Sequence, residues 1–314
     1  MSRLFLKIIA ILGMVGISSF SSGATMTHEG PVGVGGFWVF TPDHLPKHPM
    51  PVVFFFPGWS ASNTLNYGNF FEHMTEQNAV VVYIPYMDSI ATPFLTFEKN
   101  ASKGMNSALQ WLRNQAIVDE SKIMYAGHSA GAIIALSMAA RQDLVPLTPA
   151  MVLSMEPGKL FINDRKEKGR LVPAKHVADI PSSTNLVLVQ GDQAGYFNDQ
   201  GIAAPMLYDM TTNTPDSKKI ICVIESVDET QVANHFFPSA ANPAYDNGTP
   251  VGYHLRRSDR VVNIESERFV KQRENKLNTA PTNDLDLKLW AIFDKALAHI
   301  NDDALDAEEI CGQD

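Results

Sequence analysis

Short, continuously apolar runs separate longer amphipathic stretches over most of this 314-residue chain. The runs are rich in β-branched and aromatic residues, which is typical of strands buried on both faces of a parallel sheet. We expect strands at Pro51–Phe56, Ala79–Tyr86, Lys122–Ala126, Ala150–Met155, Asn185–Gln190 and Lys219–Ser226. We expect helices at Asn69–Glu76, Lys99–Gln115, Ala130–Arg141 and Leu285–Ile300. This order predicts an α/β fold, with a doubly wound, mostly parallel sheet flanked by helices in a single domain.

Two polar stretches interrupt the alternation after the late strands, at about residues 192–216 and 238–283. Both contain Pro, Gly and Asn, and loops of this length in a compact domain are usually functional or mobile. We interpret them as insertions above the sheet. They could form a lid or a substrate-binding surface, or they could be surface decoration.

The first 24 residues have the pattern of a cleaved signal peptide. Arg3 and Lys7 precede the uncharged apolar stretch Ile8–Phe20, and the small residues Ser22-Gly23-Ala24 follow it. The apolar stretch is too short to span a bilayer comfortably, so no stable membrane span is expected. We therefore predict a secreted or periplasmic protein whose mature domain covers residues 25–314.

Charge and cysteine content exclude some classes of protein. The chain has 25 Lys and Arg against 34 Asp and Glu, and its formal net charge of −9 disfavours nucleic-acid binding. Two cysteines, Cys222 and Cys311, are too few for a zinc ribbon or a disulfide scaffold. They could form one disulfide in an oxidising compartment, or Cys222 could simply be a small buried residue.

The motif Gly127-His128-Ser129-Ala130-Gly131 lies between a predicted strand and a predicted helix. A serine on such a tight turn needs small residues two positions away on either side, because the backbone brings these residues into contact. The helix N-terminus behind the serine favours negative charge that develops on a bound substrate. Ser129 is therefore the candidate nucleophile.

Around this motif the chain resembles the α/β-hydrolase superfamily. The lead-in Val118-Asp119-Glu120-Ser121-Lys122-Ile123 is similar to that of dienelactone-hydrolase-like members. The segment Pro51–Trp59 is similar to the strand and loop that carry the oxyanion hole, and bacterial cutinases and polyester hydrolases also have Pro-Gly-aromatic there. The resemblance points to the cutinase, platelet-activating-factor acetylhydrolase and chlorophyllase branches.

An oxyanion hole needs two backbone N–H groups fixed where the negative oxygen will develop. The N–H of Ala130, directly after the nucleophile, is one candidate. The resemblance implies that the N–H of Trp59 is the other, with the Trp59 ring as the floor of an apolar acyl pocket.

The catalytic base is predicted from chain order, which in this fold runs serine, acid, histidine. His235 follows the last predicted core strand and is our choice, while His254 is the reserve. His128 is expected to pack beneath the turn, because the residue before the serine points away from the site.

The triad acid is ambiguous in this sequence. In the commonest arrangement of the family the acid occupies the position of Ala194, where this chain has no carboxylate. Chlorophyllase-like members carry the acid after the preceding strand, where this chain has Glu156. Glu156 is the preferred acid, Asp192 is the alternative, and Asp199 is a weaker one.

These residues predict a secreted serine hydrolase that cleaves small or lipid-like carboxylic esters through a Ser-His-acid triad and an acyl-enzyme. The alternatives are a serine peptidase or an acyltransferase, and a catalytically inactive scaffold that binds a partner. The absent carboxylate at Ala194 is what favours the scaffold. No metal-ligand spacing and no dinucleotide or Walker motif occurs, so neither a metal nor another cofactor is expected.

Overall fold

The fold is taken from a computed structural model. The structure describes residues 23–43, 48–59, 61–88, 92–158, 174–195, 201–249, 256–257, 260–261 and 283–312. Outside these residues lie the predicted signal peptide up to residue 22 and most of residues 250–282. His254 and Asp199 also lie outside them.

Eight strands form one sheet in the order β1-β2-β4-β3-β5-β6-β7-β8. Their bounds are β1 Thr25–Glu29, β2 Phe37–Thr41, β3 Met50–Phe56, β4 Val80–Tyr83, β5 Val118–His128, β6 Met151–Met155, β7 Asn185–Gly191 and β8 Lys219–Ile224. The strands from β4 to β8 pair in parallel, whereas β1 with β2 and β2 with β4 pair antiparallel. A two-residue pair, β9 Arg256–Arg257 and β10 Arg260–Val261, lies outside this sheet. The predicted mostly parallel sheet is confirmed.

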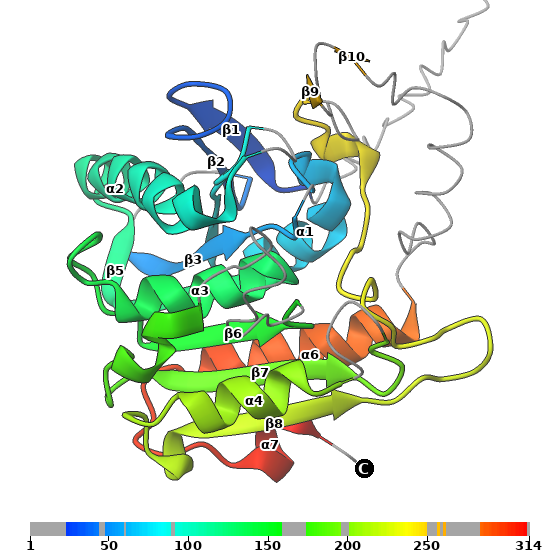
Figure 1. The fold of residues 1–314 in the computed structure, drawn as a ribbon. Coiled ribbons are helices and arrows are strands. Elements are labelled where there is room, and N and C mark those ends of the chain that lie inside the picture. Colours follow the sequence, from blue (N-terminus) through cyan, green and yellow to red (C-terminus); the bar gives the residue numbers. More distant parts are fainter. Residues whose placement is uncertain are drawn as a thin grey trace, which may run out of the picture.

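Helices cover both faces of the sheet (Figure 1). They are α1 Gly68–Glu76, α2 Phe97–Gln115, α3 Ala130–Ala140, α4 Ala203–Met210, α6 Asp284–Ala298 and α7 Ala307–Cys311. Strand residues alternate between two cores, as the pleat requires. In β3, for example, Phe54 and Phe56 belong to the core that includes residues of α2, α3 and α4, whereas Val53 and Phe55 belong to the core that includes residues of α1, α6 and α7. None of the helices within the described ranges is long and apolar enough to span a membrane.

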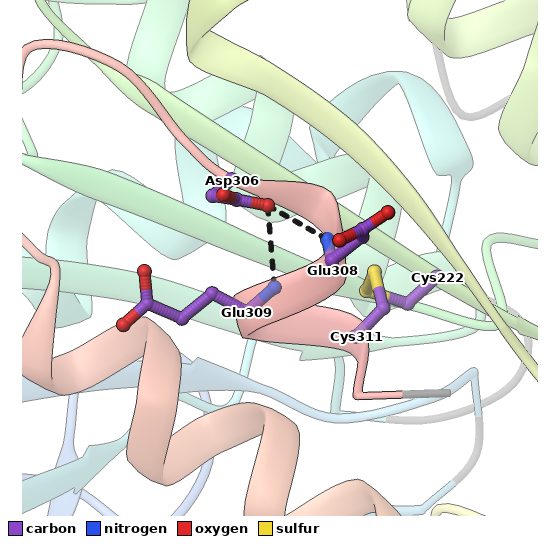
Figure 2. The surroundings of a disulfide bond; sticks show 5 residues. All are labelled: Cys222, Asp306, Glu308, Glu309 and Cys311. Carbon is purple, nitrogen blue, oxygen red and sulfur yellow. Dashed lines mark hydrogen bonds between the residues drawn. A yellow bond between two sulfur atoms is a disulfide. The ribbon is translucent and has the colours of Figure 1, made fainter. Parts of the chain in front are cut away.

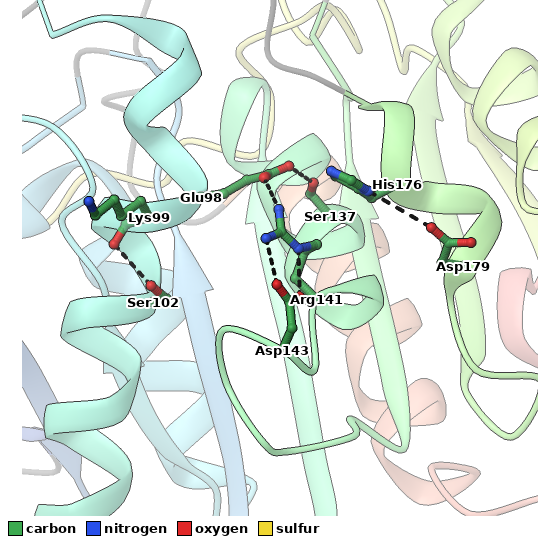
Figure 3. Close-up of polar contacts among 8 residues, drawn as sticks. All are labelled: Glu98, Lys99, Ser102, Ser137, Arg141, Asp143, His176 and Asp179. Atoms are coloured by element: carbon green, nitrogen blue, oxygen red, sulfur yellow. Dashed lines mark hydrogen bonds and ion pairs between the residues drawn. The ribbon is translucent and has the colours of Figure 1, made fainter.

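One buried carboxylate joins α2 to α3. Glu98 on α2 is 7% exposed, and Arg141, just after α3, donates to its Oε2 at 2.7 Å. Ser137 on α3 donates to the other oxygen (Figure 3). A buried charge is tolerated only with such partners, so this contact stabilises the position of α3 behind the turn at its N-terminus.

The sequence did not predict β1, β2, α4 or α7. β1 and β2 pair with each other at the sheet edge, and β1 is only partly buried, so it lacks the continuous apolar run of a central strand. α4 lies within the stretch 192–216 and buries Ala203, Ala204 and Leu207 against the core. Residues 203–210, within the stretch predicted as the first insertion, therefore form a helix between β7 and β8.

The two cysteines form a disulfide. Cys222 of β8 is bonded to Cys311 of α7 (Figure 2), and the sequence separation of the two cysteines is 89. Asp306 is the N-cap of α7, and its Oδ1 accepts the N–H groups of Glu308 and Glu309. The bond therefore attaches the end of the described chain to the edge strand of the sheet.

Strand register brings the carboxyl ends of five strands, β3, β5, β6, β7 and β8, together at one end of the sheet. Phe56 of β3 lies beside Gly127 of β5, and His128 of β5 lies beside Met155 of β6. Met155 pairs in turn with Val189 of β7, which continues to Gly191. Gly191 pairs with Ile224 at the end of β8. The loops that follow these strands carry Trp59, Ser129, Glu156, Asp192 and His235. These predicted site residues therefore all lie at the carboxyl ends of the strands.

Candidate active site

Ser129 occupies a sharp turn between β5 and α3. Its φ of 57° and ψ of −120° lie in a region that non-glycine residues rarely adopt. A Cβ on Gly127 would overlap the carbonyl oxygen of Gly131, and a Cβ on Gly131 would overlap that of Phe56. Because glycine stands at both positions, the turn can close against the end of β3 with the serine at its apex.

The backbone of Ser129 is fixed from both sides by the loop that follows β6. The Ser129 N–H donates to the Met155 carbonyl oxygen at 3.1 Å, and the Gly158 N–H donates to the Ser129 carbonyl oxygen at 3.0 Å. Glu156 lies in the sequence between Met155 and Gly158, the two residues that make these hydrogen bonds. The nucleophile and the preferred acid are therefore held by one short network.

His235 lies against the serine. Its Nε2 is 2.8 Å from Ser129 Oγ, and the residue is 4% exposed. The loop before it is attached to the end of β7, since the Gln193 N–H donates to the Ala233 carbonyl oxygen at 3.1 Å. Burial lowers the pKa of His235 to about 4, which keeps the imidazole neutral at neutral pH.

Glu156 lies on the other side of the imidazole. Its Oε2 is 3.4 Å from His235 Nδ1, and its Oε1 accepts the N–H of Gly191. The side chain is fully buried, and its backbone has a φ of 43°. The structure thus brings Ser129, His235 and Glu156 into one row.

Asp192 is not part of this row. It is exposed, and its Oδ1 accepts the Ser226 hydroxyl at 2.6 Å. Ala194, the position where the family resemblance implies an acid, is 4% exposed and carries no polar group. Of the carboxylates proposed from the sequence, Glu156 is the one that meets the imidazole among the described residues.

Both expected oxyanion donors border the serine. Ala130 is the first residue of α3, where backbone N–H groups have no intrahelical acceptor. Trp59 follows Gly58, and a Cβ on Gly58 would be 3.4 Å from Ser129 Cβ. Trp59 is 41% exposed, and its ring lies 6.0 Å from the ring of Phe94, so the two rings form an apolar rim beside this loop.

A second histidine, His128, is buried beneath the turn, as the sequence predicted. Its Nδ1 is 2.9 Å from the hydroxyl oxygen of Tyr67, and its Nε2 is 2.7 Å from the carbonyl oxygen of His235. Burial and the neighbouring His235 lower the pKa of His128 to about 3. Sequence reasoning missed Tyr67, because it lies in the polar stretch Asn63–Tyr67, which reads as an ordinary loop.

In the part of the chain that the structure describes, no group of three or more His, Cys, Asp or Glu side chains could hold a metal ion. The side chains that meet at the turn are those of a partly exposed serine, a buried imidazole and a buried carboxylate.

A family model described as "alpha/beta hydrolase fold" matches residues 57–207. This match spans the predicted oxyanion loop, the Ser129 turn and Glu156, and it agrees with the sheet order and the helices on both faces. The chain therefore has the α/β-hydrolase fold. No curated protein matches its sequence significantly.

Solved structures of low sequence identity are similar to this chain. An acylaminoacyl peptidase from Pyrococcus horikoshii is 11% identical, with a TM-score of 0.55 over 92% of this chain and 44% of that chain. An esterase from Pyrobaculum calidifontis is 14% identical, with a TM-score of 0.48 over 68% of this chain and 79% of that chain. Thermogutta terrifontis esterase 2 is also 14% identical, with a TM-score of 0.48 over 68% of this chain and 85% of that chain. The likeness to the peptidase shows the fold alone, and this chain spans less than half of that protein's length.

Proposed function

We propose that this protein is an exported serine hydrolase that cleaves carboxylic esters through an acyl-enzyme. The observation that carries the proposal is the row of side chains from Ser129 Oγ, 2.8 Å from His235 Nε2, to the buried carboxylate of Glu156, 3.4 Å from His235 Nδ1. The same three groups, in the same order, activate serine nucleophiles on unrelated folds.

In this mechanism Ser129 Oγ attacks the ester carbonyl carbon while His235 Nε2 takes the hydroxyl proton. The carbonyl oxygen becomes an oxyanion and is stabilised by the N–H groups of Ala130 and Trp59. The intermediate collapses, the bond between the carbonyl carbon and the leaving alcohol oxygen breaks, and Nε2 returns its proton to that oxygen. Water then attacks the acyl-enzyme by the same route, releasing the acid and restoring Ser129.

Glu156 has a defined part in this sequence. Nε2 can accept a proton only when Nδ1 carries one, and the Oε2 at 3.4 Å from Nδ1 favours that tautomer. The same carboxylate stabilises the imidazolium that forms after proton transfer. An acid after β6 also accounts for Ala194 without invoking an inactive scaffold.

The rim supports a small or lipid-like ester as substrate. Trp59, Phe94 and Leu95 present apolar surface beside the predicted oxyanion loop, with Leu95 78% exposed. We expect kcat/KM for p-nitrophenyl esters to rise from acetate to hexanoate. A preference for acetate would contradict this assignment of the substrate.

The disulfide supports export, because disulfides persist in oxidising compartments and are rare in the cytosol. It agrees with the signal-peptide pattern of residues 1–24. Intact mass of the protein secreted from its native host or from a Sec-competent bacterium tests this, since cleavage after Ala24 gives a defined mass.

The deciding experiment is labelling with a fluorophosphonate, together with hydrolysis of p-nitrophenyl butyrate and of the matching p-nitroanilide. The wild-type protein should be labelled and should prefer the ester, and Ser129→Ala should lose both labelling and hydrolysis. Full activity in Ser129→Ala would overturn the proposal. Preference for the anilide would indicate a peptidase, and an unlabelled wild-type protein would indicate an inactive scaffold.

A further inference from the structure

The loop that contains Gly58 and Trp59 is held by the hydroxyls of three buried tyrosines. Tyr86 donates to the Pro57 carbonyl oxygen at 2.7 Å, the Gly58 N–H donates to Tyr67 Oη at 2.9 Å, and Tyr83 donates to the Ala61 carbonyl oxygen. All three rings are at most 1% exposed. Buried hydroxyls with backbone partners restrict a loop that glycine would otherwise leave free to move.

Tyr67 also reaches the other two catalytic segments. Its Oη is 2.9 Å from His128 Nδ1, and His128 Nε2 is 2.7 Å from the His235 carbonyl oxygen. A single chain of hydrogen bonds thus runs from the predicted oxyanion loop, beneath the nucleophile, to the backbone of the predicted base.

The direction of this chain is fixed at both ends. A carbonyl oxygen can only accept, so His128 Nε2 carries the proton and Nδ1 is the acceptor. The Tyr67 hydroxyl therefore donates to Nδ1, and its oxygen accepts the Gly58 N–H. Each group has the partner it needs, and His128 is neutral, in agreement with its lowered pKa.

Packing makes the chain sensitive to small displacements. A Cβ on Gly58 would lie 3.2 Å from both His128 Nδ1 and Tyr67 Oη. The Gly58 backbone therefore packs directly against the side chains of Tyr67 and His128, which connect it to the Ser129 turn. Trp59 is the next residue in the sequence.

We propose that Tyr67, acting through His128, is a positioning residue that holds the predicted oxyanion donor of Trp59 in register with the Ser129–His235 pair. This inference rests on the proposed function. Neither side chain contacts the reacting atoms, so the expected effect of their loss is on the transition state and not on substrate binding.

The test is Tyr67→Phe, with Tyr125→Phe as the matched control. Tyr125 is also fully buried, and its hydroxyl donates to the Leu147 carbonyl oxygen at 3.3 Å, so it takes no part in the hydrogen bonds from Gly58 to His235. Activity on p-nitrophenyl butyrate is referred to active sites titrated with a fluorophosphonate, so that misfolded protein does not count. Tyr67→Phe should lower kcat per titrated site by about 10- to 100-fold with KM changed by less than about twofold, and Tyr125→Phe should match the wild type.

A transition-state analogue separates positioning from a general structural role. The inhibition constant of a boronic acid, which forms a tetrahedral adduct on Ser129, should rise in Tyr67→Phe by the same factor as kcat falls. Inhibition by the product butyrate should stay unchanged. Equal kcat per titrated site in Tyr67→Phe and Tyr125→Phe would overturn the proposal.

Two further measurements apply if Tyr67→Phe does not fold. His128→Phe interrupts the same chain at the next position and should give the same division between kcat and KM. In the wild-type protein, nitrogen-15 chemical shifts of His128 at pH 6 should show a neutral ring protonated at Nε2, and protonation at Nδ1 would overturn the inference. An inactive wild-type protein would instead refute the proposed function, which these outcomes do not address.

Discussion

At the residue scale, Glu156 is a carboxylate with no exposed surface and a backbone in the left-handed region. An unpaired buried charge is costly, and a φ of 43° adds strain for a non-glycine residue. The Gly191 N–H and the His235 imidazole compensate the charge. A strained backbone that directs a buried carboxylate at an imidazole is consistent with selection for function at this position.

Replacing Glu156 tests its role directly. Glu156→Gln keeps the shape but presents either a donor to Nδ1–H or a donor to the Gly191 N–H, so the imidazole loses its tautomer control. We expect kcat on p-nitrophenyl butyrate to fall by about 100- to 10,000-fold. Asp192→Asn, which changes an exposed carboxylate bonded to Ser226, should remain near the wild type. The reverse ranking of the two variants would assign the acid to Asp192.

The buried imidazole also predicts a pH profile. Burial lowers the pKa of His235 to about 4, and only the neutral ring can accept the serine proton. Activity is therefore present above this pKa and is lost as the pH falls through it. We expect kcat/KM to stay constant between pH 8 and pH 6 and to reach half its value near pH 4, with circular dichroism verifying the fold at each pH. A midpoint near the ordinary histidine value of about 6.5 would contradict the burial argument.

At the scale of elements, the strands and helices that could be predicted from the sequence are those with the most deeply buried residues. The six strands from β3 to β8 and the four helices α1, α2, α3 and α6 were predicted from the sequence, because continuous apolar runs and helical periodicity both persist in a buried sheet. β1 is half exposed and lies at the edge, and α4 lies in a stretch rich in Pro, Gly and Asn. Neither has the pattern on which the predictions depended.

The candidate site was predictable to the extent that it is local. Ser129 has a motif around it, and His235 has a place in the chain order, and the structure sets them 2.8 Å apart. The choice between Glu156 and Asp192 depends on which loop turns inward, which no local pattern encodes. Tyr67 contacts His128 across 61 residues, and a lone tyrosine in a polar loop carries no signal of that contact.

The turn itself yields a prediction for Gly131. Its Cβ would overlap the carbonyl oxygens of Phe56 and Pro57, so Gly131→Ala must displace the end of β3 and the loop that carries Trp59. We expect kcat/KM to fall by more than about 100-fold. Gly104→Ala, in helix α2, meets its neighbours at 3.2 Å and serves as the control. Similar activity in both variants would show that the turn tolerates a methyl group.

At the scale of the whole molecule, two cores lie on opposite faces of one sheet, and the last described helix, α7, is bonded to the edge strand β8. α7 contributes Ile310 to the core on the α1 and α6 side, and Cys311 bonds to Cys222 of β8. β8 is the strand from which the loop to His235 departs. The disulfide therefore fixes the C-terminal helix to the part of the sheet that supports the predicted base, at a distance from the reacting atoms.

This arrangement predicts that the disulfide contributes to stability and leaves the chemistry alone. A cross-link between two residues with a sequence separation of 89 restricts the unfolded chain, and removing a native disulfide typically costs about 2 to 5 kcal/mol. We expect Cys222→Ala with Cys311→Ala to lower the free energy of unfolding in urea by about that amount. At 25 °C, kcat per titrated site should be unchanged, since the row from Ser129 to Glu156 does not involve either cysteine. Reduction of the wild-type protein, verified by mass, should reproduce the loss, and a loss of kcat without a loss of stability would show that the bond positions His235.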